Sequence, residues 1–147
     1  MIPARIRTAA VAVAMLATVA ACKKKEAAPP PAAEPAAPAP VAVSDIKTGN
    51  AIGADKMVTS PTSEFGPGDT IYVSVATTGT AASASLHAHW TFQTGQLVDS
   101  TTVMIAPTGP AVTEFHVSKA SPWPKGKYKV AIFLNDGAVG EREFEVK

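Results

Sequence analysis

The stretch that decides the fold is "SLHAHWTF", residues 85–92. Its even-numbered positions are apolar, and two histidines and a threonine occupy the odd-numbered positions between them. An alternation of period two is typical of a β-strand that has one buried and one exposed face. We therefore expect Trp90 to lie in the core, with His87 and His89 on the outer face.

Six further segments, rich in alternating apolar and polar residues, lie on either side of this one. Turn sequences such as "GPGD" (66–69) and "PTGP" (107–110) separate them. The expected strands are 43–51, 70–77, 84–93, 96–105, 112–118, 127–135 and 138–146. Short strands at this spacing, without a long amphipathic helix, predict an all-β, seven-stranded antiparallel sandwich.

A second informative stretch is "PKGKYKVAIFL", residues 124–134. Gly126 precedes Tyr128 by two positions, and Val130 follows it by two. This pattern resembles the tyrosine corner of immunoglobulin-like domains, with Trp90 as the core tryptophan and Val130 where antibody domains carry cysteine. The resemblance implies an immunoglobulin-like β-sandwich over residues 42–147. It implies no function, because this fold serves many.

The last two expected strands allow a test of register. A three-residue loop at 135–137, with its glycine left-handed, places Tyr128 opposite Phe144 inside and Lys129 opposite Glu143 outside. A two-residue loop would instead place Lys129 opposite Phe144. Because only the first arrangement pairs apolar with apolar and lysine with glutamate, we predict the three-residue loop.

The residues before the sandwich have the organisation of an export signal. Arg5 and Arg7 form a basic region, residues 8–19 form an apolar run, and small residues follow at 20 and 21. The apolar run is shorter than the roughly 20 residues that a membrane-spanning helix needs. We therefore predict a signal peptide over residues 1–21.

Cys22, the single cysteine of the chain, follows this signal directly. The sequence Val19-Ala20-Ala21-Cys22 resembles the lipobox of bacterial lipoproteins, which implies cleavage before Cys22 and acylation of its sulfur and of the new amine. The alternative is an ordinary signal peptide with an incidental cysteine, which would leave a reactive thiol in an oxidising compartment. In Gram-negative lipoproteins, a residue other than aspartate at the next position, here Lys23, implies sorting to the outer membrane.

Residues 22–41 are expected to form the lipid anchor and a disordered tether. From 26 to 40 the chain contains only Glu, Ala and Pro, and proline supplies no amide donor for a helix or sheet. In the polyproline II conformation, the roughly 19 residues between Cys22 and Ala42 would span about 60 Å. A proline-rich ligand for another protein is the alternative interpretation.

His87 and His89 are the main candidates for a metal site, because side chains two apart on a strand lie on one face, about 6.6 Å apart. A stable site needs a third or fourth ligand. Asp99 neighbours His89 if residues 93–95 form a three-residue loop, but points inward if 94–95 form a two-residue turn. The sequence leaves both open, and His116 is expected on the opposite sheet. Metal binding or pH sensing is therefore the alternative to solvated histidines.

Two aromatic residues are candidates for partner binding. Trp123 lies between two prolines, and it is either a plug that closes one end of the core or an exposed anchor for a partner. We favour the plug. Phe133 is expected to face outward beside the histidines, within a small apolar patch.

The composition argues against several function classes. The formal net charge is +1, and no basic patch with interleaved aromatics supports nucleic-acid binding. We find no G-x-S-x-G turn, no phosphate-binding glycine loop and no paired-cysteine zinc motif, so we expect neither an enzyme nor a cofactor. The sequence thus predicts a cell-envelope lipoprotein with a non-catalytic binding or structural domain in the periplasm. Its expected partners are the membrane, through the lipid, and an envelope protein or glycan.

Overall fold

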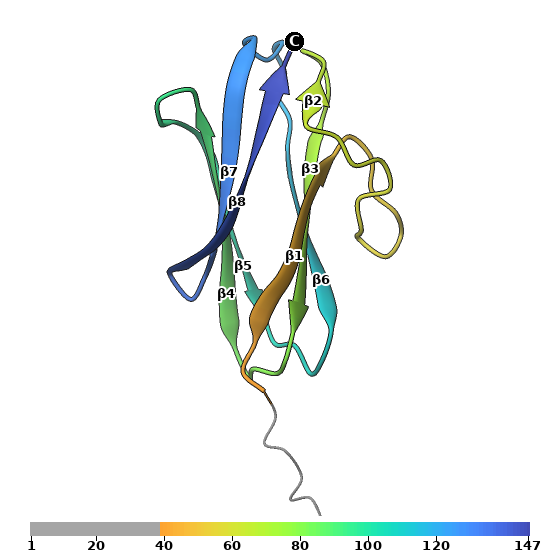
Figure 1. Ribbon diagram of the computed structural model, residues 1–147, viewed down its shortest axis with the longest axis vertical. Helices are drawn as coiled ribbons and strands as arrows, with labels where there is room; N and C mark the ends of the chain where they lie inside the picture. Colours follow the sequence, from red (N-terminus) through yellow and green to blue (C-terminus); the bar gives the residue numbers. More distant parts are fainter. Residues whose placement is uncertain (1–38) are drawn as a thin grey trace, which may run out of the picture. The chain divides into compact units, whose positions relative to one another are not determined.

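The computed structural model describes residues 39–147, which form eight β-strands in two packed sheets (Figure 1). The strands are β1 (Ala42–Gly49), β2 (Glu64–Phe65), β3 (Ile71–Thr78), β4 (Ala84–Phe92), β5 (Gln96–Ile105), β6 (Ala111–Val117), β7 (Gly126–Leu134) and β8 (Gly137–Val146). Seven of them match the predicted ranges to within two residues. The short β2 is an addition that the sequence did not predict.

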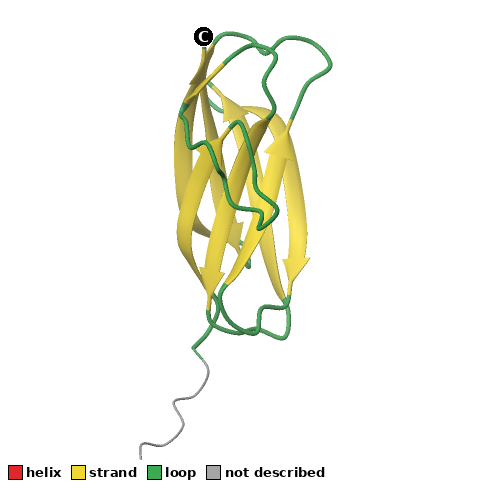
Figure 2. Cartoon of the chain, turned by 90° about the vertical axis from the view of Figure 1, so that its right-hand side faces the viewer, coloured by secondary structure: helices red, strands yellow, loops and turns green. Residues whose placement is uncertain are grey.

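The smaller sheet has the strand order β1-β3-β6, and the larger has the order β2-β8-β7-β4-β5. All neighbouring strands are antiparallel except β2 and β8, which pair in parallel over two residues. Figure 2 shows the strands of both layers aligned along one common axis, with the connections between them at the two ends of the sandwich. The predicted immunoglobulin-like antiparallel sandwich is confirmed.

The two sheets enclose one hydrophobic core. Leu86, Ala88 and Trp90 of β4 are at most 1% exposed, whereas His87 and His89 face outward and are half-buried. The face assignment made from residues 85–92 is therefore confirmed. Among residues 39–147, all members of the core cluster lie between Ile46 and Val146, so this part of the chain encloses a hydrophobic core of its own.

Tyr128 forms the predicted tyrosine corner. Its hydroxyl donates a hydrogen bond of 2.8 Å to the carbonyl oxygen of Pro124, four residues earlier. Val130 is fully buried and pairs with Trp90 across the β4–β7 ladder. Burial raises the pKa of Tyr128 above its ordinary value of 10.0, because the phenolate would lose hydration.

The last hairpin has the predicted register but a different turn. Tyr128 pairs with Phe144 and Lys129 with Glu143, as expected. The loop, however, consists of two residues, Asn135 and Asp136, with φ of 49° and 67°. Two consecutive left-handed residues are typical of a type I′ turn, which asparagine and aspartate tolerate. The prediction of a three-residue loop was wrong.

A β-bulge reconciles the two-residue turn with that register. Ile132 pairs with Gly140, but Phe133 pairs with Ala138, so that Val139 is an extra residue in β8. The extra residue shifts the pairing by one position, which is the shift that a three-residue loop would have supplied. The predicted register is therefore confirmed, and the bulge at Val139 produces it in place of a longer loop.

The described chain joins the sandwich at one end, and its C-terminus lies at the other (Figure 1). Thr80 donates its backbone N–H to the carbonyl of Ala39 at 2.9 Å, and Pro40 forms a bridge with Thr80. Gly79 permits this contact, since it has φ of +88° and a Cβ there would lie 2.3 Å from the Pro40 oxygen. Residues 1–38, with the predicted signal peptide, Cys22 and most of the predicted tether, lie outside the described residues.

Candidate functional site

Three ring side chains lie together on the outer face of the larger sheet, and we call them the histidine face. The rings of His87 and His89 are stacked, with centroids 5.9 Å apart and an interplanar angle of 7°. Phe133 of β7 pairs with His87 across the ladder, and its ring lies 5.7 Å from that of His87 and 6.5 Å from that of His89. The His87 Nε2 atom is 2.6 Å from the Ser100 hydroxyl of β5.

Asp99 does not join the histidine face. The β4–β5 hairpin has the three-residue loop that would have placed Asp99 near His89, since Phe92 pairs with Gln96. A β-bulge at Val98 then shifts the register, so that Asp99 pairs with Trp90, an inward position, and Ser100 takes the place opposite His89. The candidate metal ligand is therefore corrected: Asp99 lines a cleft on the inner side of β5.

Among residues 39–147, the histidine face thus has two imidazoles and no carboxylate placed beside them to complete a metal site. His116 lies on β6 in the other sheet, where its Nδ1 is 2.5 Å from the Glu114 carboxylate. Within residues 39–147, no group of three or more His, Cys, Asp or Glu side chains is placed to hold a metal ion. Two imidazoles alone fall short of the three or four ligands of a stable zinc site.

Trp123 closes one end of the core. It is 3% exposed, its indole N–H donates to the Asp69 carbonyl oxygen at 2.9 Å, and its ring meets that of Tyr128 edge-on at 5.6 Å. The Lys119 ammonium lies 5.3 Å from the ring centroid, within cation–π range. Of the two alternatives, Trp123 is therefore the plug that closes the core and not an exposed anchor for a partner.

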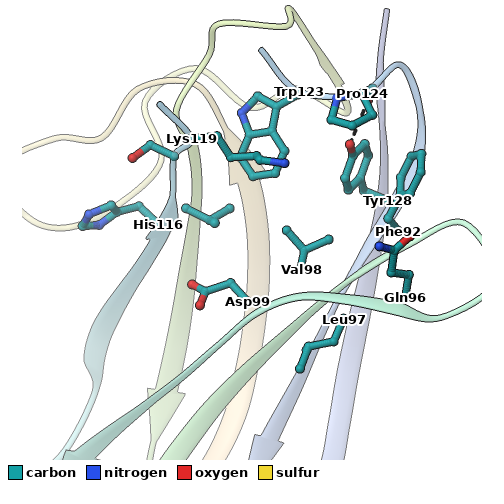
Figure 3. Close-up of a pocket in the computed structure, with 12 residues that line it drawn as sticks. Phe92, Gln96, Leu97, Val98, Asp99, His116, Lys119, Trp123, Pro124 and Tyr128 are labelled. Carbon is teal, nitrogen blue, oxygen red and sulfur yellow. Dashed lines mark hydrogen bonds between the residues drawn. The ribbon is translucent and has the colours of Figure 1, made fainter. Parts of the chain in front are cut away.

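A cleft of about 540 Å³ opens beside Trp123, and we call it the distal cleft (Figure 3). It is lined by the start of β5, the end of β6 and the β6–β7 connection. Val117 is 7% exposed and, with Trp123 and Tyr128, contributes largely buried apolar surface to its floor. The volume of the cleft is within the usual range of ligand sites, and its lining combines polar and apolar side chains in similar measure.

Two opposite charges lie at the rim of the distal cleft. The Asp99 carboxylate accepts one long hydrogen bond, of 3.4 Å, from the Thr101 hydroxyl. Neither Asp99 nor Lys119 forms an ion pair with any residue between 39 and 147. Both charges are therefore available to a ligand. The sequence did not predict this cleft, because it depends on the Val98 bulge and on the juxtaposition of β5 and β6 from different sheets.

The distal cleft lies at the end of the sandwich opposite to the one where the described chain joins it. Ala42 pairs with Thr78 at the end of β3, whereas Val117 at the cleft pairs with Ile71 at its start. The part of the chain that the structure describes contains no helix long and apolar enough to cross a membrane.

A scan against protein-family models gives no match, and a search of curated proteins finds no similar sequence. Solved structures are similar in fold. A β-glucosidase of Erythrobacter marinus aligns over 74% of this chain and 15% of its own, with a TM-score of 0.53 and 9% identity. An immunoglobulin-like protein of Pseudomonas aeruginosa aligns over 74% of this chain and 98% of its own, with a TM-score of 0.49 and 17% identity.

The alkylpurine DNA glycosylase AlkC of Pseudomonas fluorescens aligns over 73% of this chain, with a TM-score of 0.48 and 15% identity. The chain spans 30% of that protein and 15% of the β-glucosidase, so that it matches only a part of either enzyme. At such identities the likeness concerns the fold alone. The chain is a protein with an immunoglobulin-like β-sandwich.

Proposed function

We propose that this protein is a lipid-anchored component of a bacterial cell envelope whose sandwich domain is a non-catalytic binding module. The observation that carries the proposal is the position of the distal cleft, at the end of the domain opposite to residues 39–42. A partner in that cleft would not compete for space with residues 39–42, where the described chain joins the sandwich. The lipobox-like sequence at residues 19–22 supports the anchor.

The chemistry of the cleft favours a polypeptide partner over a glycan. Sugar rings pack their C–H surfaces on exposed aromatic faces, but Trp123 and Tyr128 are only 3% and 4% exposed and Phe92 is half-buried. The accessible lining consists of the charged Asp99 and Lys119 and of the exposed residues Gln96, His116, Ser118 and Pro124. Hydrogen-bonding groups with one charge of each sign suit a segment of protein that carries both acidic and basic side chains.

The arrangement at the cleft supports binding and not catalysis. His116 is paired with Glu114, as a general base would be with an orienting carboxylate. Ser118 lies two residues further along, yet within residues 39–147 no hydrogen bond joins its hydroxyl to the His116 ring. A serine nucleophile needs such a bond to a base for its activation.

The alternative function, metal binding or pH sensing by the histidine face, has one observation in its favour, the parallel stacking of His87 and His89 at 5.9 Å. It lacks a third ligand among the described residues. We therefore place it second.

The anchor is tested by metabolic labelling of the full chain with an alkyne-bearing fatty acid. The wild type should incorporate the label and sediment with membranes, and Cys22→Ser should lose both properties. A matched variant, Ser44→Cys in the Cys22→Ser background, supplies a cysteine elsewhere and should remain unlabelled. Equal labelling of wild type and Cys22→Ser would refute the lipid anchor.

The binding role is tested by replacing Ser118, an exposed residue of the cleft lining, with a photo-crosslinking amino acid, in cells that express the anchored protein. We expect one adduct of discrete mass, which the additional substitution Asp99→Lys abolishes. Ser60, exposed on the loop between β1 and β2, is the control position. The same adducts from both positions, or none from the cleft, would contradict the proposal.

A further inference from the structure

Strand β5 is the outermost strand of the larger sheet, and it pairs only with β4. Ten residues long, it contains no lysine, arginine, glycine or proline, and its one charge is Asp99. Leu97 and Met104 on this strand are 58% and 66% exposed, and they are the two most exposed large hydrophobic residues between 39 and 147. An edge of this kind presents unpaired backbone groups that another strand can bind.

The other edges carry features that oppose such pairing. At β1, a register irregularity near Ser44 and the ion pair of Lys47 with Asp45 interrupt the edge, and Arg142 bonds the Ile46 carbonyl oxygen. The edge of β8 is partly covered by β2. The edge of β6 carries the paired Glu114 and His116. Charges and irregular pairing are the usual means by which proteins protect sheet edges.

We propose that β5 is a dimerisation surface, on which a second copy of this chain pairs its own β5 in antiparallel orientation. A two-fold axis through Thr101 joins the two larger sheets into one continuous sheet, with Ser100 opposite Thr102 of the second copy. Because such an interface is isologous, every contact occurs twice.

The Val98 bulge makes this register self-complementary. Leu97 and Met104 are seven positions apart, so in a regular strand they would lie on opposite faces. With the bulge, Leu97 pairs with Thr91 and Met104 with Ser85, which are both outward positions of β4. In the proposed register, Leu97 of each copy lies opposite Met104 of the other. The two exposed hydrophobic side chains of the strand thereby cover each other.

Charge also favours a second copy. Asp99 lies opposite Val103 of the second copy, and the two Asp99 carboxylates are four strand positions apart, about 13 Å along the strands. That separation exceeds the Debye length of about 8 Å at physiological salt, so their repulsion is largely screened. A partner chain of the same sequence therefore meets no like charge across the strands.

The register is tested first by sedimentation of a protein comprising residues 39–147, which encloses the hydrophobic core described above and lacks Cys22. The wild type should form a reversible dimer within the micromolar to millimolar range. Ser100→Lys with Thr102→Lys places lysine opposite lysine twice and should weaken the dimer about tenfold or more. Ser100→Glu with Thr102→Lys places opposite charges in the same contacts and should restore it.

Thr59→Lys with Ser60→Lys, on the loop between β1 and β2, adds the same charge away from β5 and should leave dimerisation unchanged. Thermal unfolding of each variant establishes that loss of the dimer is not loss of the fold. A wild type that remains monomeric over the whole range overturns the proposal. So does a charge-paired variant as weak as the double-lysine variant.

A second measurement uses the geometry of disulfides. Directly opposed strand residues have Cα atoms about 4.5–5.5 Å apart, within the range that a disulfide spans. In the 39–147 protein, Leu97→Cys with Met104→Cys should form covalent dimers under mild oxidation, because each new thiol faces the other type across the interface. Each single substitution should not, since its equivalents in the two copies are six ladder positions, or about 20 Å, apart. Equal crosslinking by the single variants would overturn the register.

Discussion

The two tryptophans of the chain allow a sharp test of the core, because they differ in one respect. Trp90 and Trp123 are 1% and 3% exposed, respectively. The indole N–H of Trp123 donates to the Asp69 carbonyl oxygen at 2.9 Å, whereas Trp90 Nε1 is buried without a partner among the described residues. We predict that replacement by phenylalanine destabilises the protein more at Trp123 than at Trp90.

The magnitude follows from the fate of the two N–H groups. Both substitutions remove a similar volume of ring and leave similar cavities, so this term largely cancels in the comparison. Trp123→Phe loses a hydrogen bond with a net value of about 0.5–1.5 kcal/mol, and Trp90→Phe removes an unsatisfied buried donor that costs about 1–3 kcal/mol. The free energy of unfolding should therefore fall by about 1.5–4.5 kcal/mol more in Trp123→Phe than in Trp90→Phe.

The measurement is equilibrium unfolding in urea, followed by circular dichroism and by fluorescence of the remaining tryptophan. Trp90→Ala, which removes the whole ring beside Val130 and Phe144, serves as a reference and should cost about 3–5 kcal/mol. Equal losses in the two phenylalanine variants, or a larger loss at Trp90, would refute the reasoning. Such a result would mean that the Trp90 N–H has a partner, such as a buried water.

Three further predictions concern the tyrosine corner, the contact of Gly79 with Pro40, and the histidine face. Tyr128→Phe should lower the free energy of unfolding by about 1 kcal/mol through its lost hydrogen bond. Because burial raises the pKa of Tyr128, the folded state holds the phenolic proton more tightly than the unfolded state. The free energy of unfolding of the wild type should therefore be unaffected by this group below pH 10.0 and should fall above it. Tyr128→Phe should lack this decrease above pH 10.0. Gly79→Ala should lower Tm clearly, since its Cβ would lie 2.3 Å from the Pro40 oxygen, and an unchanged Tm would contradict the contact. Equimolar Zn²⁺ should not raise the Tm of the wild type. In calorimetric titration with Zn²⁺, the double variant His87→Ala, His89→Ala should behave like the wild type. A tight Zn²⁺ site that is present in the wild type and lost in the double variant would contradict this expectation.

The faces of the strands could be predicted from sequence because burial imposes a period of two on the backbone. Residues 85–92 placed Trp90 inside and His87 and His89 outside, and the structure has them so. The tyrosine corner could also be predicted, since Tyr128 and Pro124 lie four residues apart and their contact depends on local conformation. These features require no knowledge of which strands pair.

The β-bulges could not be predicted, because an extra residue in a strand is selected by contacts from other parts of the chain. In β8, the bulge at Val139 places Gly140 against Ile46 of the other sheet, where a Cβ would lie 2.7 Å from the Ile46 Cδ1 atom. Two residues later, Arg142 donates to the Ile46 carbonyl oxygen at 2.8 Å. The presence of a glycine and an arginine in the strand sequence does not predict these contacts with Ile46, because the residues involved are almost a hundred positions apart.

The bulge at Val98 determines which side chains of β5 face outward and which face the distal cleft. Without it, Asp99 would face His89 on the outer side of the sheet, and the histidine face would have the third ligand that a metal site needs. With it, Asp99 pairs with Trp90 and turns to the distal cleft, where its charge is available to a partner. The same shift brings Leu97 onto the face that carries Met104, on which the self-pairing of β5 depends. Deletion of Val98 should remove the bulge yet keep Leu97 opposite Thr91 and Asp99 opposite Trp90, so dimerisation should persist and no Zn²⁺ site should form. Loss of the dimer, or a tight Zn²⁺ site in this variant, would contradict the assignment of Val98 as the extra residue.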